Sequence, residues 1–258
     1  MTAPVVYTLD IETAPLEVYS WGLWDVNVGL NQIITEWSLL SFAAKRLDQK
    51  TVIYRDNRGQ KDTRDDKALM SGLWSILNES DIIIAQNGKK FDLRKINARF
   101  AMLGFDPPSP YRVIDTVLEA RKSFGFTSNK LEWLSKYLTP AKKSQHKKFP
   151  GFELWTECLK DNQAAWKEME KYNKRDVIAT EQLYYKLRPW MPTHLNVNAF
   201  DGASEIKCPK CNSDDVQKRG FTFTNLAKYA RIRCNTCKGW SRGRENLHSK
   251  AKRKGLLA

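Results

Sequence analysis

The feature that most constrains the fold is a short segment in which every side chain is apolar: Ile82, Ile83, Ile84 and Ala85. A strand with one solvated face alternates apolar and polar residues, so an unbroken apolar run is typical of a strand covered on both faces in an α/β sheet. Further strands are predicted at residues 5–9, 37–47 and 51–54, and helices at residues 67–77, 94–103, 131–138 and 163–187. The sequence therefore predicts a mixed α/β fold.

Four of the five cysteines form two C-x-x-C pairs near the C-terminus, Cys208 with Cys211 and Cys234 with Cys237. This spacing is typical of a tetrahedral Cys₄ zinc ribbon rather than of a disulfide framework. A closed Cys₄ site leaves no open coordination position, so the single Zn²⁺ that we predict is structural and not catalytic. Two independent redox dithiols are the alternative interpretation.

Charge is distributed unevenly along the chain. Lys and Arg number 43 against 29 Asp and Glu, a net charge of +14, which favours a polyanionic partner; a merely soluble basic protein is the alternative. Residues 201–258 hold 14 Lys and Arg against 5 Asp and Glu, or +9 of that surplus. Pro, Asn and Gly interrupt the helical pattern after residue 188. We therefore predict a large domain over residues 1–190, a linker over 191–206, the ribbon over 207–245 and a basic tail over 246–258.

No segment of the sequence indicates a membrane partner. The apolar runs fall far short of the roughly 18 to 20 residues that span a bilayer. The N-terminus carries Asp10 and Glu12 where a signal peptide would be apolar. We expect a cytoplasmic location.

Two short motifs place carboxylates at the ends of predicted elements. Asp10-x-Glu12 closes the first strand, and alternate residues of a strand point to the same face. The segment from Asn87 to Asp92 follows the apolar run, with Gly88 permitting a tight turn and Asp92 at the start of the next helix. Taken alone, each motif has a simpler interpretation, a solvated strand end for the first and a helix cap for the second.

A third motif lies on the long helix, where a fourth carboxylate, Asp176, interrupts an apolar stripe. Steps of three or four residues keep it on one face with Ala165, Met169, Tyr172, Ala179 and Leu183. A buried carboxylate needs a cation or a proton, and a metal ion is the simplest source of positive charge. A helix salt bridge to a neighbouring Lys or Arg is the alternative.

In this order and on these elements, the set resembles the DEDD superfamily of 3′-to-5′ exonucleases, in its tyrosine (DEDDy) subgroup. The residues that carry the resemblance, which spans roughly residues 5–187, are Asp10, Glu12, Asp92, Tyr172 and Asp176. The resemblance implies an RNase H-like mixed β-sheet flanked by helices, followed here by the small C-terminal zinc ribbon.

The resemblance also implies a role for each residue. Asp10 would bridge two metal ions, Glu12 and Asp176 would complete the site that carries the attacking water, and Asp92 would serve the second ion. Tyr172 would orient the water. Independently of the family, two divalent ions about 3.5 to 4 Å apart stabilise the charge that develops in phosphodiester hydrolysis. Oxygen-only ligands favour two Mg²⁺ or Mn²⁺ ions over Zn²⁺ at this site.

Nucleic-acid contacts are predicted in three places. Trp21 and Trp24 follow the first motif and could stack on bases, although packing under the loop is the alternative. A basic loop at residues 142–148, before the third motif, could lie beside the substrate; a solvent-exposed loop without a binding role is the alternative. The ribbon supplies further cations. The predicted contact residues are Asn87, Trp21, Trp24, Lys142, Lys143, Lys147, Lys148, Lys218, Arg219, Arg231 and Arg233.

These features together predict a metal-dependent 3′-to-5′ exonuclease whose zinc ribbon helps to bind nucleic acid, with DNA favoured over RNA. A protein partner for the ribbon is an alternative. A non-catalytic nucleic-acid-binding protein with the same fold is a second interpretation, and the intact carboxylate set argues against it. An endonuclease on a related sheet is a third, and the helical Tyr-x-x-x-Asp motif favours the exonuclease.

Overall fold

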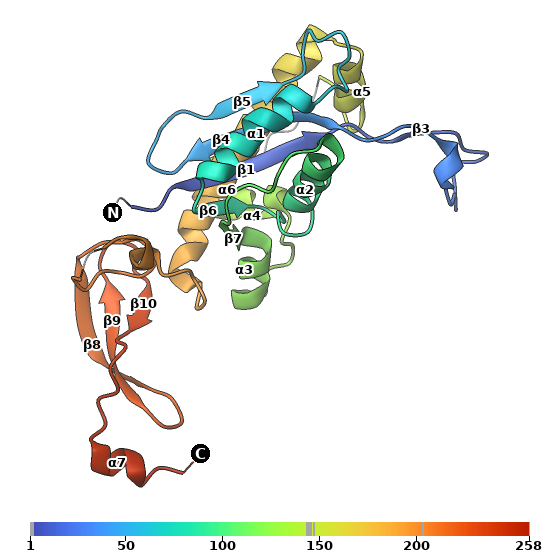
Figure 1. Ribbon diagram of the computed structural model, residues 1–258. Helices are drawn as coiled ribbons and strands as arrows, with labels where there is room; N and C mark the ends of the chain where they lie inside the picture. Colours follow the sequence, from blue (N-terminus) through green and yellow to red (C-terminus); the bar gives the residue numbers. More distant parts are fainter. Residues whose placement is uncertain (1–2, 143–145, 147, 203, 258) are drawn as a thin grey trace. The chain divides into compact units, whose positions relative to one another are not determined.

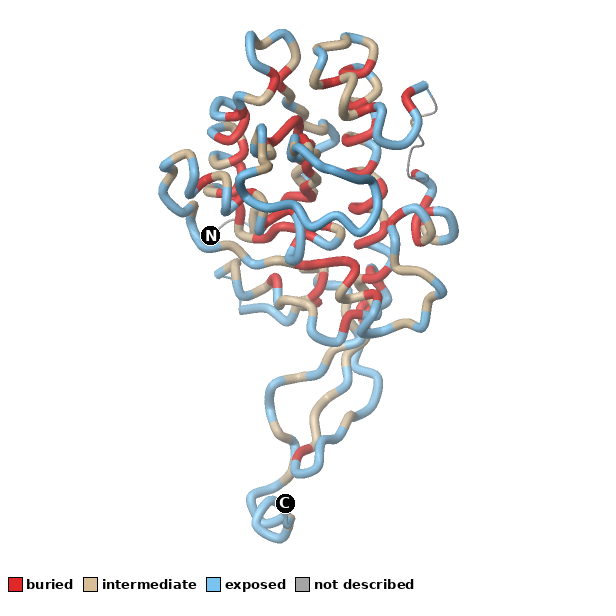
Figure 2. Tube along the Cα trace, turned by 90° about the vertical axis from the view of Figure 1, so that its right-hand side faces the viewer, coloured by how far each residue is buried: buried red, intermediate tan, exposed pale blue. Residues whose placement is uncertain are grey.

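The computed structural model describes residues 3–142, 146, 148–202 and 204–257. The chain forms two compact units. The larger unit is Val5–Tyr184, and the second, which we call the cysteine unit, comprises Tyr185–Ala258 together with Met1–Pro4. Figure 2 shows that buried residues gather in the larger unit, whereas most of the trace near the C-terminus is exposed or intermediate.

A five-stranded mixed sheet forms the centre of the larger unit (Figure 1), with strand order β5-β4-β1-β6-β7. Its strands are β1 (Val6–Thr13), β4 (Leu39–Arg46), β5 (Ile53–Asp56), β6 (Ile82–Ala85) and β7 (Arg112–Asp115). β1 pairs antiparallel with β4 and parallel with β6, so it lies at the centre of the sheet. All four residues of β6 are buried, as the apolar run predicted. The predicted mixed α/β fold is confirmed.

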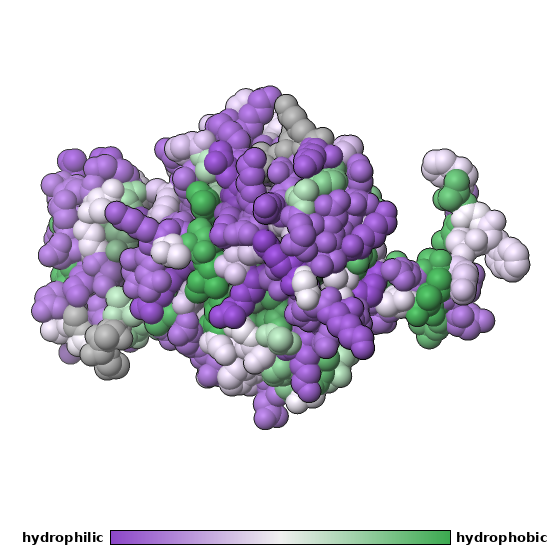
Figure 3. All heavy atoms as spheres, turned by 90° about the horizontal axis from the view of Figure 1, so that it is seen from above, coloured by the Kyte–Doolittle hydropathy of each residue, from purple (hydrophilic) through white to green (hydrophobic). Residues whose placement is uncertain are grey.

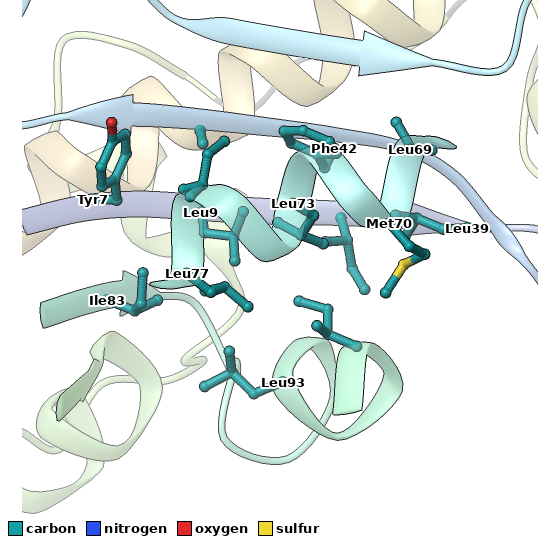
Figure 4. Packing of buried hydrophobic residues seen from close by; sticks show 14 of the residues in the cluster. Tyr7, Leu9, Leu39, Phe42, Leu69, Met70, Leu73, Leu77, Ile83 and Leu93 are labelled. Atoms are coloured by element: carbon teal, nitrogen blue, oxygen red, sulfur yellow. The ribbon is translucent and has the colours of Figure 1, made fainter. Parts of the chain in front are cut away.

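Helices cover both faces of this sheet. On one face, Leu9 of β1 and Phe42 of β4 share a core with Leu73 of α1 (Figure 4), and on the other Leu40 of β4 shares a core with Trp166 of α6. The helices of the unit are α1 (Lys67–Glu79), α2 (Asp92–Leu103), α3 (Thr116–Ser123), α4 (Leu131–Leu138), α5 (Glu153–Leu159) and α6 (Gln163–Leu187). None of the described helices has the length and apolar character needed to cross a bilayer.

Between β1 and β4 the chain leaves the sheet as an extended arm, residues 15–36. The arm contains β2 (Glu17–Val18), the 3₁₀ helix η1 (Leu30–Gln32) and β3 (Ile33–Thr35), and β2 pairs with β3. Figure 3 shows hydrophobic residues (green) on the arm among residues of intermediate or hydrophilic character. Both predicted stacking residues, Trp21 and Trp24, lie here and are almost fully exposed. The arm carries three acidic residues and no Lys or Arg, so the positive charge that phosphate binding needs would have to come from elsewhere.

The cysteine unit is built on a three-stranded antiparallel sheet of order β10-β9-β8. Its elements are η2 (Arg188–Trp190), η3 (Val197–Phe200), β8 (Val216–Phe223), β9 (Lys228–Cys234), β10 (Trp240–Arg242) and α7 (Lys250–Lys254). The predicted linker includes η3, where Val197 N–H donates a hydrogen bond of 2.8 Å to the Pro209 carbonyl. Part of that segment therefore packs on the first cysteine loop.

Candidate active site and cysteine centre

The first motif lies at the C-terminal end of β1, where Asp10 and Glu12 are half-buried. Asn173 of α6 donates its side-chain N–H to Asp10 Oδ2 at 2.6 Å and to the Asp10 carbonyl at 3.3 Å. Trp155 of α5 donates its indole N–H to Glu12 Oε2 at 3.0 Å. Each carboxylate is thus held by a neutral donor from a helix outside the sheet.

The second motif meets β1 between these two residues. Asp92, the first residue of α2, is buried, and its Oδ1 accepts the Ile11 N–H at 3.3 Å. This bond lies beyond the stretch of β1 that pairs with β6. Burial raises the pKa of Asp92 to about 6, so a nearby cation would favour its charged form.

A buried carboxylate at the end of β7 fixes the turn that carries Asp92. Asp115 accepts the backbone N–H groups of Asn87 and Lys89, each at 3.1 Å. Asn87 has the left-handed φ of 65° that Asn tolerates better than most residues. Gly88 has no room for a side chain, because a Cβ there would collide with Ala85 Cβ. The sequence of this turn therefore determines where the second motif lies.

The third motif lies on the stripe of α6 that the sequence predicted to be buried, and all six of its residues are buried. Asp176 is 3% exposed and Tyr172 is 7% exposed. The Tyr172 ring lies edge-on to His146 and Trp155, at centroid distances of 5.3 and 6.1 Å. Trp155 therefore connects Glu12 with Tyr172.

A surface hollow of about 540 Å³ brings three predicted site residues together: Asp10, Asn87 and Asp176. Its remaining wall is formed by Gln86, Val117, Arg121, Ser128, Asn129, Lys130, Leu131 and Glu132. Glu12, Asp92 and Tyr172 do not line it. Asp92 hydrogen-bonds to the backbone of β1 between Asp10 and Glu12. Trp155 contacts both Glu12 and Tyr172. In the described part of the chain the carboxylates are not clustered as tightly as the four cysteines.

The residues at this site fit a hard divalent cation. Asp10, Asp92 and Asp176 come from β1, α2 and α6, and offer only oxygen ligands. Asp92 is buried with a raised pKa, and Asp10 and Asp176 line the same hollow. Carboxylates placed in this way repel one another and destabilise the fold when they are charged, and a bound cation removes that repulsion.

A pH-dependent stability follows from the raised pKa of Asp92, about 6 against 3.8 for an ordinary Asp. The folded state prefers protonated Asp92, so this stabilisation is complete below pH 4 and is lost as the pH rises through 6. Without added Mg²⁺ or Mn²⁺, Asp92→Asn should raise the free energy of unfolding at pH 8 by on the order of 3 kcal/mol, and not at pH 4. Thermal unfolding of both proteins at pH 4 and pH 8 measures this effect. The same difference in stability between the two proteins at both pH values would contradict it.

The four cysteines form a compact centre. Their Sγ atoms all lie within 4.8 Å of one another, with Cys208 3.6 Å from Cys237 and Cys211 3.7 Å from Cys234. A tetrahedral zinc site with Zn–S bonds of about 2.3 Å has sulfur separations of about 3.8 Å, so the thiols fit zinc. Burial opposes ionisation of Cys234, but the N–H groups of Cys237 and Thr236 hold its pKa to about 7.

The basic residues predicted to contact nucleic acid lie in two parts of the chain, the basic loop after α4 and the sheet of the cysteine unit. The Lys142 ammonium donates to the carbonyls of Ser135, Lys136 and Thr139 at 3.1, 2.8 and 2.6 Å, so it caps the end of α4. Lys148 is exposed. Lys143 and Lys147 lie outside the described residues. The predicted ribbon cations Lys218, Arg219, Arg231 and Arg233 line a second hollow on the sheet of the cysteine unit.

Sequence reasoning did not identify Asn173 or Trp155 as site residues. Asn173 had a detectable signal, because it lies four residues after Met169 and three before Asp176 and so falls on the buried stripe. Trp155 had none, since its partner Glu12 is 143 residues away in the sequence.

Fold and site together define an α/β domain that gathers carboxylates at the end of its central strand. The chain belongs to the RNase H superfamily: the family profile described as "RNase_H superfamily" matches residues 8–188. RNase H-like nucleases use divalent metal ions, and the family indicates a nuclease that acts on nucleic acid.

Among solved structures, the chain is similar to the family B DNA polymerase from the hyperthermophilic archaeon Pyrobaculum calidifontis, with a TM-score of 0.49 and 16% sequence identity. The similarity covers 74% of this chain and 26% of the polymerase chain, so the chain spans about a quarter of the polymerase. A search of curated proteins finds no match.

Proposed function

We propose that the larger unit is a metal-dependent 3′-to-5′ exonuclease that hydrolyses phosphodiester bonds of nucleic acid, with DNA favoured over RNA, by a two-metal mechanism. The observation that supports this is the convergence of the three motifs on β1. Asp10 and Asp176 line one hollow, and Asp92 hydrogen-bonds to the backbone between Asp10 and Glu12. In this proposal the cysteine unit is a zinc ribbon that helps to bind the substrate. A cytoplasmic location remains part of the proposal, because thiolate ligands require reduced cysteines.

The side chains divide the work of such a site. Bound Mg²⁺ or Mn²⁺ ions would stabilise the negative charge on the phosphate, the attacking water and the leaving 3′-oxygen. Asp10, Glu12, Asp92 and Asp176 would hold the ions, and Tyr172 would orient the water. Asn173 and Trp155 would act as positioning residues, because each fixes a carboxylate with a hydrogen bond.

The test is an incubation of the full-length protein with 5′-labelled single- and double-stranded DNA and RNA, with Mg²⁺, Mn²⁺ or neither. Stepwise shortening from the 3′ end of DNA, only with a metal, is the expected result. Internal cuts in the first products would favour an endonuclease. Binding without cleavage under every condition would favour a non-catalytic protein.

Tyr172→Phe should slow cleavage by about ten- to a thousandfold without abolishing it, because one positioning hydrogen bond is lost while the ring still packs on Trp155. Tyr184→Phe is a matched control, since it removes a hydroxyl from a buried tyrosine three turns further along α6. Single-turnover rates on the preferred substrate measure the difference. Equal rates for the two variants would show that Tyr172 serves only in packing.

Asn173→Ala should reduce cleavage by about 10- to 100-fold and raise the metal concentration needed for half-maximal rate, because Asp10 loses the donor that orients it. The measurement is a titration of cleavage rate with Mn²⁺. Ser41→Ala is the control, since Ser41 donates a hydrogen bond to the Asn173 side chain from β4, and it should have the smaller effect. A lower maximal rate with an unchanged metal requirement would argue against positioning of a metal ligand.

A further inference from the structure

The strands of the cysteine unit lie in an unusually basic part of the chain. Residues 216–244 contain eight Lys and Arg and no Asp or Glu. A segment of this kind attracts phosphate groups. How the strands distribute these charges decides what kind of ligand they can hold.

The strand register separates the side chains into two faces. Trp240 lies opposite Arg233 and Arg242 lies opposite Arg231, so these four residues share one face. Tyr229 lies two residues before Arg231 on the same face. We call these five residues the arginine face. The opposite face, which we call the lysine face, carries Lys218, Phe221, Phe223 and Lys228.

Aromatic rings and a backbone carbonyl hold the guanidinium groups of the arginine face in place. The Cζ atoms of Arg231 and Arg233 lie 5.1 and 5.7 Å from the centroid of the Trp240 ring. Arg242 Cζ lies 4.0 Å from the ring centroid of Tyr229. Pre-ordered guanidinium groups lose little entropy when they bind phosphate. Trp240 itself is 47% exposed, so part of its ring surface is open to a flat ligand.

A bulge in β8 adds a further arginine beside this face. The register shifts between Lys218 and Phe221, and Gly220 adopts a left-handed φ of 74°. The inserted residue Arg219 accepts a hydrogen bond of 2.8 Å from Arg231 Nε at its carbonyl. The result is an open hollow of about 600 Å³ lined by Lys218, Arg219, Gly220, Arg231, Arg233 and Trp240.

We propose that the arginine face and its hollow bind single-stranded nucleic acid. The guanidinium groups of Arg219, Arg231 and Arg233 would contact successive phosphates, and an unpaired base would stack on Trp240. A single strand is favoured because the faces of paired bases are covered by their neighbours in a duplex. The inference rests on the proposed function only for the nature of the substrate, since it assigns binding and no chemistry to this face.

The test measures binding by the full-length protein without added Mg²⁺ or Mn²⁺, by fluorescence anisotropy over a salt series. The probes are a labelled oligothymidylate, an oligouridylate and a DNA duplex of the same length. Both single strands should bind more tightly than the duplex, and the stronger of the two distinguishes DNA from RNA. Trp240→Leu should weaken single-strand binding about tenfold with an unchanged salt slope, and Trp240→Phe should restore it.

The double variant Arg231→Ala/Arg233→Ala should weaken binding and also reduce the salt slope by about 1.4, the value for two phosphate contacts on a single strand. Lys228→Ala/Lys250→Ala is the matched control, because it removes the same charge from the cysteine unit at residues that do not line the hollow. It should have a clearly smaller effect on both affinity and slope. Zinc content confirms that each variant keeps its fold, and Arg231→Gln/Arg233→Gln, which also removes both charges, replaces the first variant if it does not.

Three results would overturn the proposal: equal losses in the two alanine double variants, undiminished binding by Trp240→Leu, or tighter binding of the duplex. The first result would show that binding depends only on the net charge of the unit and not on the arginine face. Because cleavage is measured separately, a protein that shows the expected losses but cuts nothing overturns the proposed exonuclease and leaves this inference standing. A protein that cleaves nucleic acid while the variants show none of these losses overturns this inference and leaves the proposed exonuclease standing.

Discussion

Asp176→Asn is expected to lower the rate of phosphodiester cleavage by at least about a thousandfold, which corresponds to the several kcal/mol that metal ions supply to the transition state. Asp176 is 3% exposed and lines the same hollow as Asp10. The amide keeps the shape of the side chain and removes a negative charge that would hold a cation. The fold should be retained, and stability without metal should be equal or higher, because a buried charge is lost.

Glu132→Gln is the matched control, because Glu132 lines the same hollow from α4 and lies outside the proposed ligand set. It should cleave at the wild-type rate. That result would show that removing any one negative charge from the hollow does not explain the slower cleavage by Asp176→Asn. Single-turnover cleavage and metal binding by calorimetry are measured on both variants. An Asp176→Asn variant that cleaves as fast as the control would contradict the proposed role.

Cys234→Ser is expected to abolish zinc binding and unfold the cysteine unit, while the larger unit melts as in the wild type. The buried cluster described for the cysteine unit consists of Cys208, Cys234 and Cys237, with Cys211 and Val216 packed against it. A unit with so small a core depends on its metal, and structural zinc supplies about 10–16 kcal/mol of apparent binding free energy. Zinc quantification and amide hydrogen exchange measure the two effects.

Cys158→Ala provides the control for this experiment. Cys158 is fully buried in the larger unit and packs near Trp166, so its replacement should lower the stability of that unit and leave one zinc ion per chain. Retention of zinc by Cys234→Ser would contradict the zinc ribbon assignment. So would freshly purified, reduced wild-type protein without zinc.

Much of the fold could be predicted because its strongest elements have periodic patterns. β6, α4 and α6 have the predicted bounds. β7 was missed because its four residues include an exposed arginine and follow a proline-rich loop. The strands of the arm were missed because apolar residues there are not sheltered by the body of the protein, so burial imposes no alternation on them.

The acidic residues of the candidate site were easier to predict than their surroundings. A carboxylate within an apolar stripe, such as Asp176, conflicts with its neighbours and can be recognised locally. The hydrogen bonds of Trp155 to Glu12 and of Asp115 to the Asn87 turn join segments far apart in the sequence. Only the completed topology brings such partners together, so no local pattern indicates them.

The hydrogen bond between Asn173 and Asp10 has a consequence for how the protein is made, because the two residues are 163 positions apart. Closing so long a loop requires the intervening strands and helices to be in place, and contacts between distant residues form slowly. A growing chain that ends before α6 has Asp10, Glu12 and Asp92 but lacks both Tyr172 and Asp176. Each newly made molecule is therefore without a complete site until synthesis of the larger unit is nearly finished.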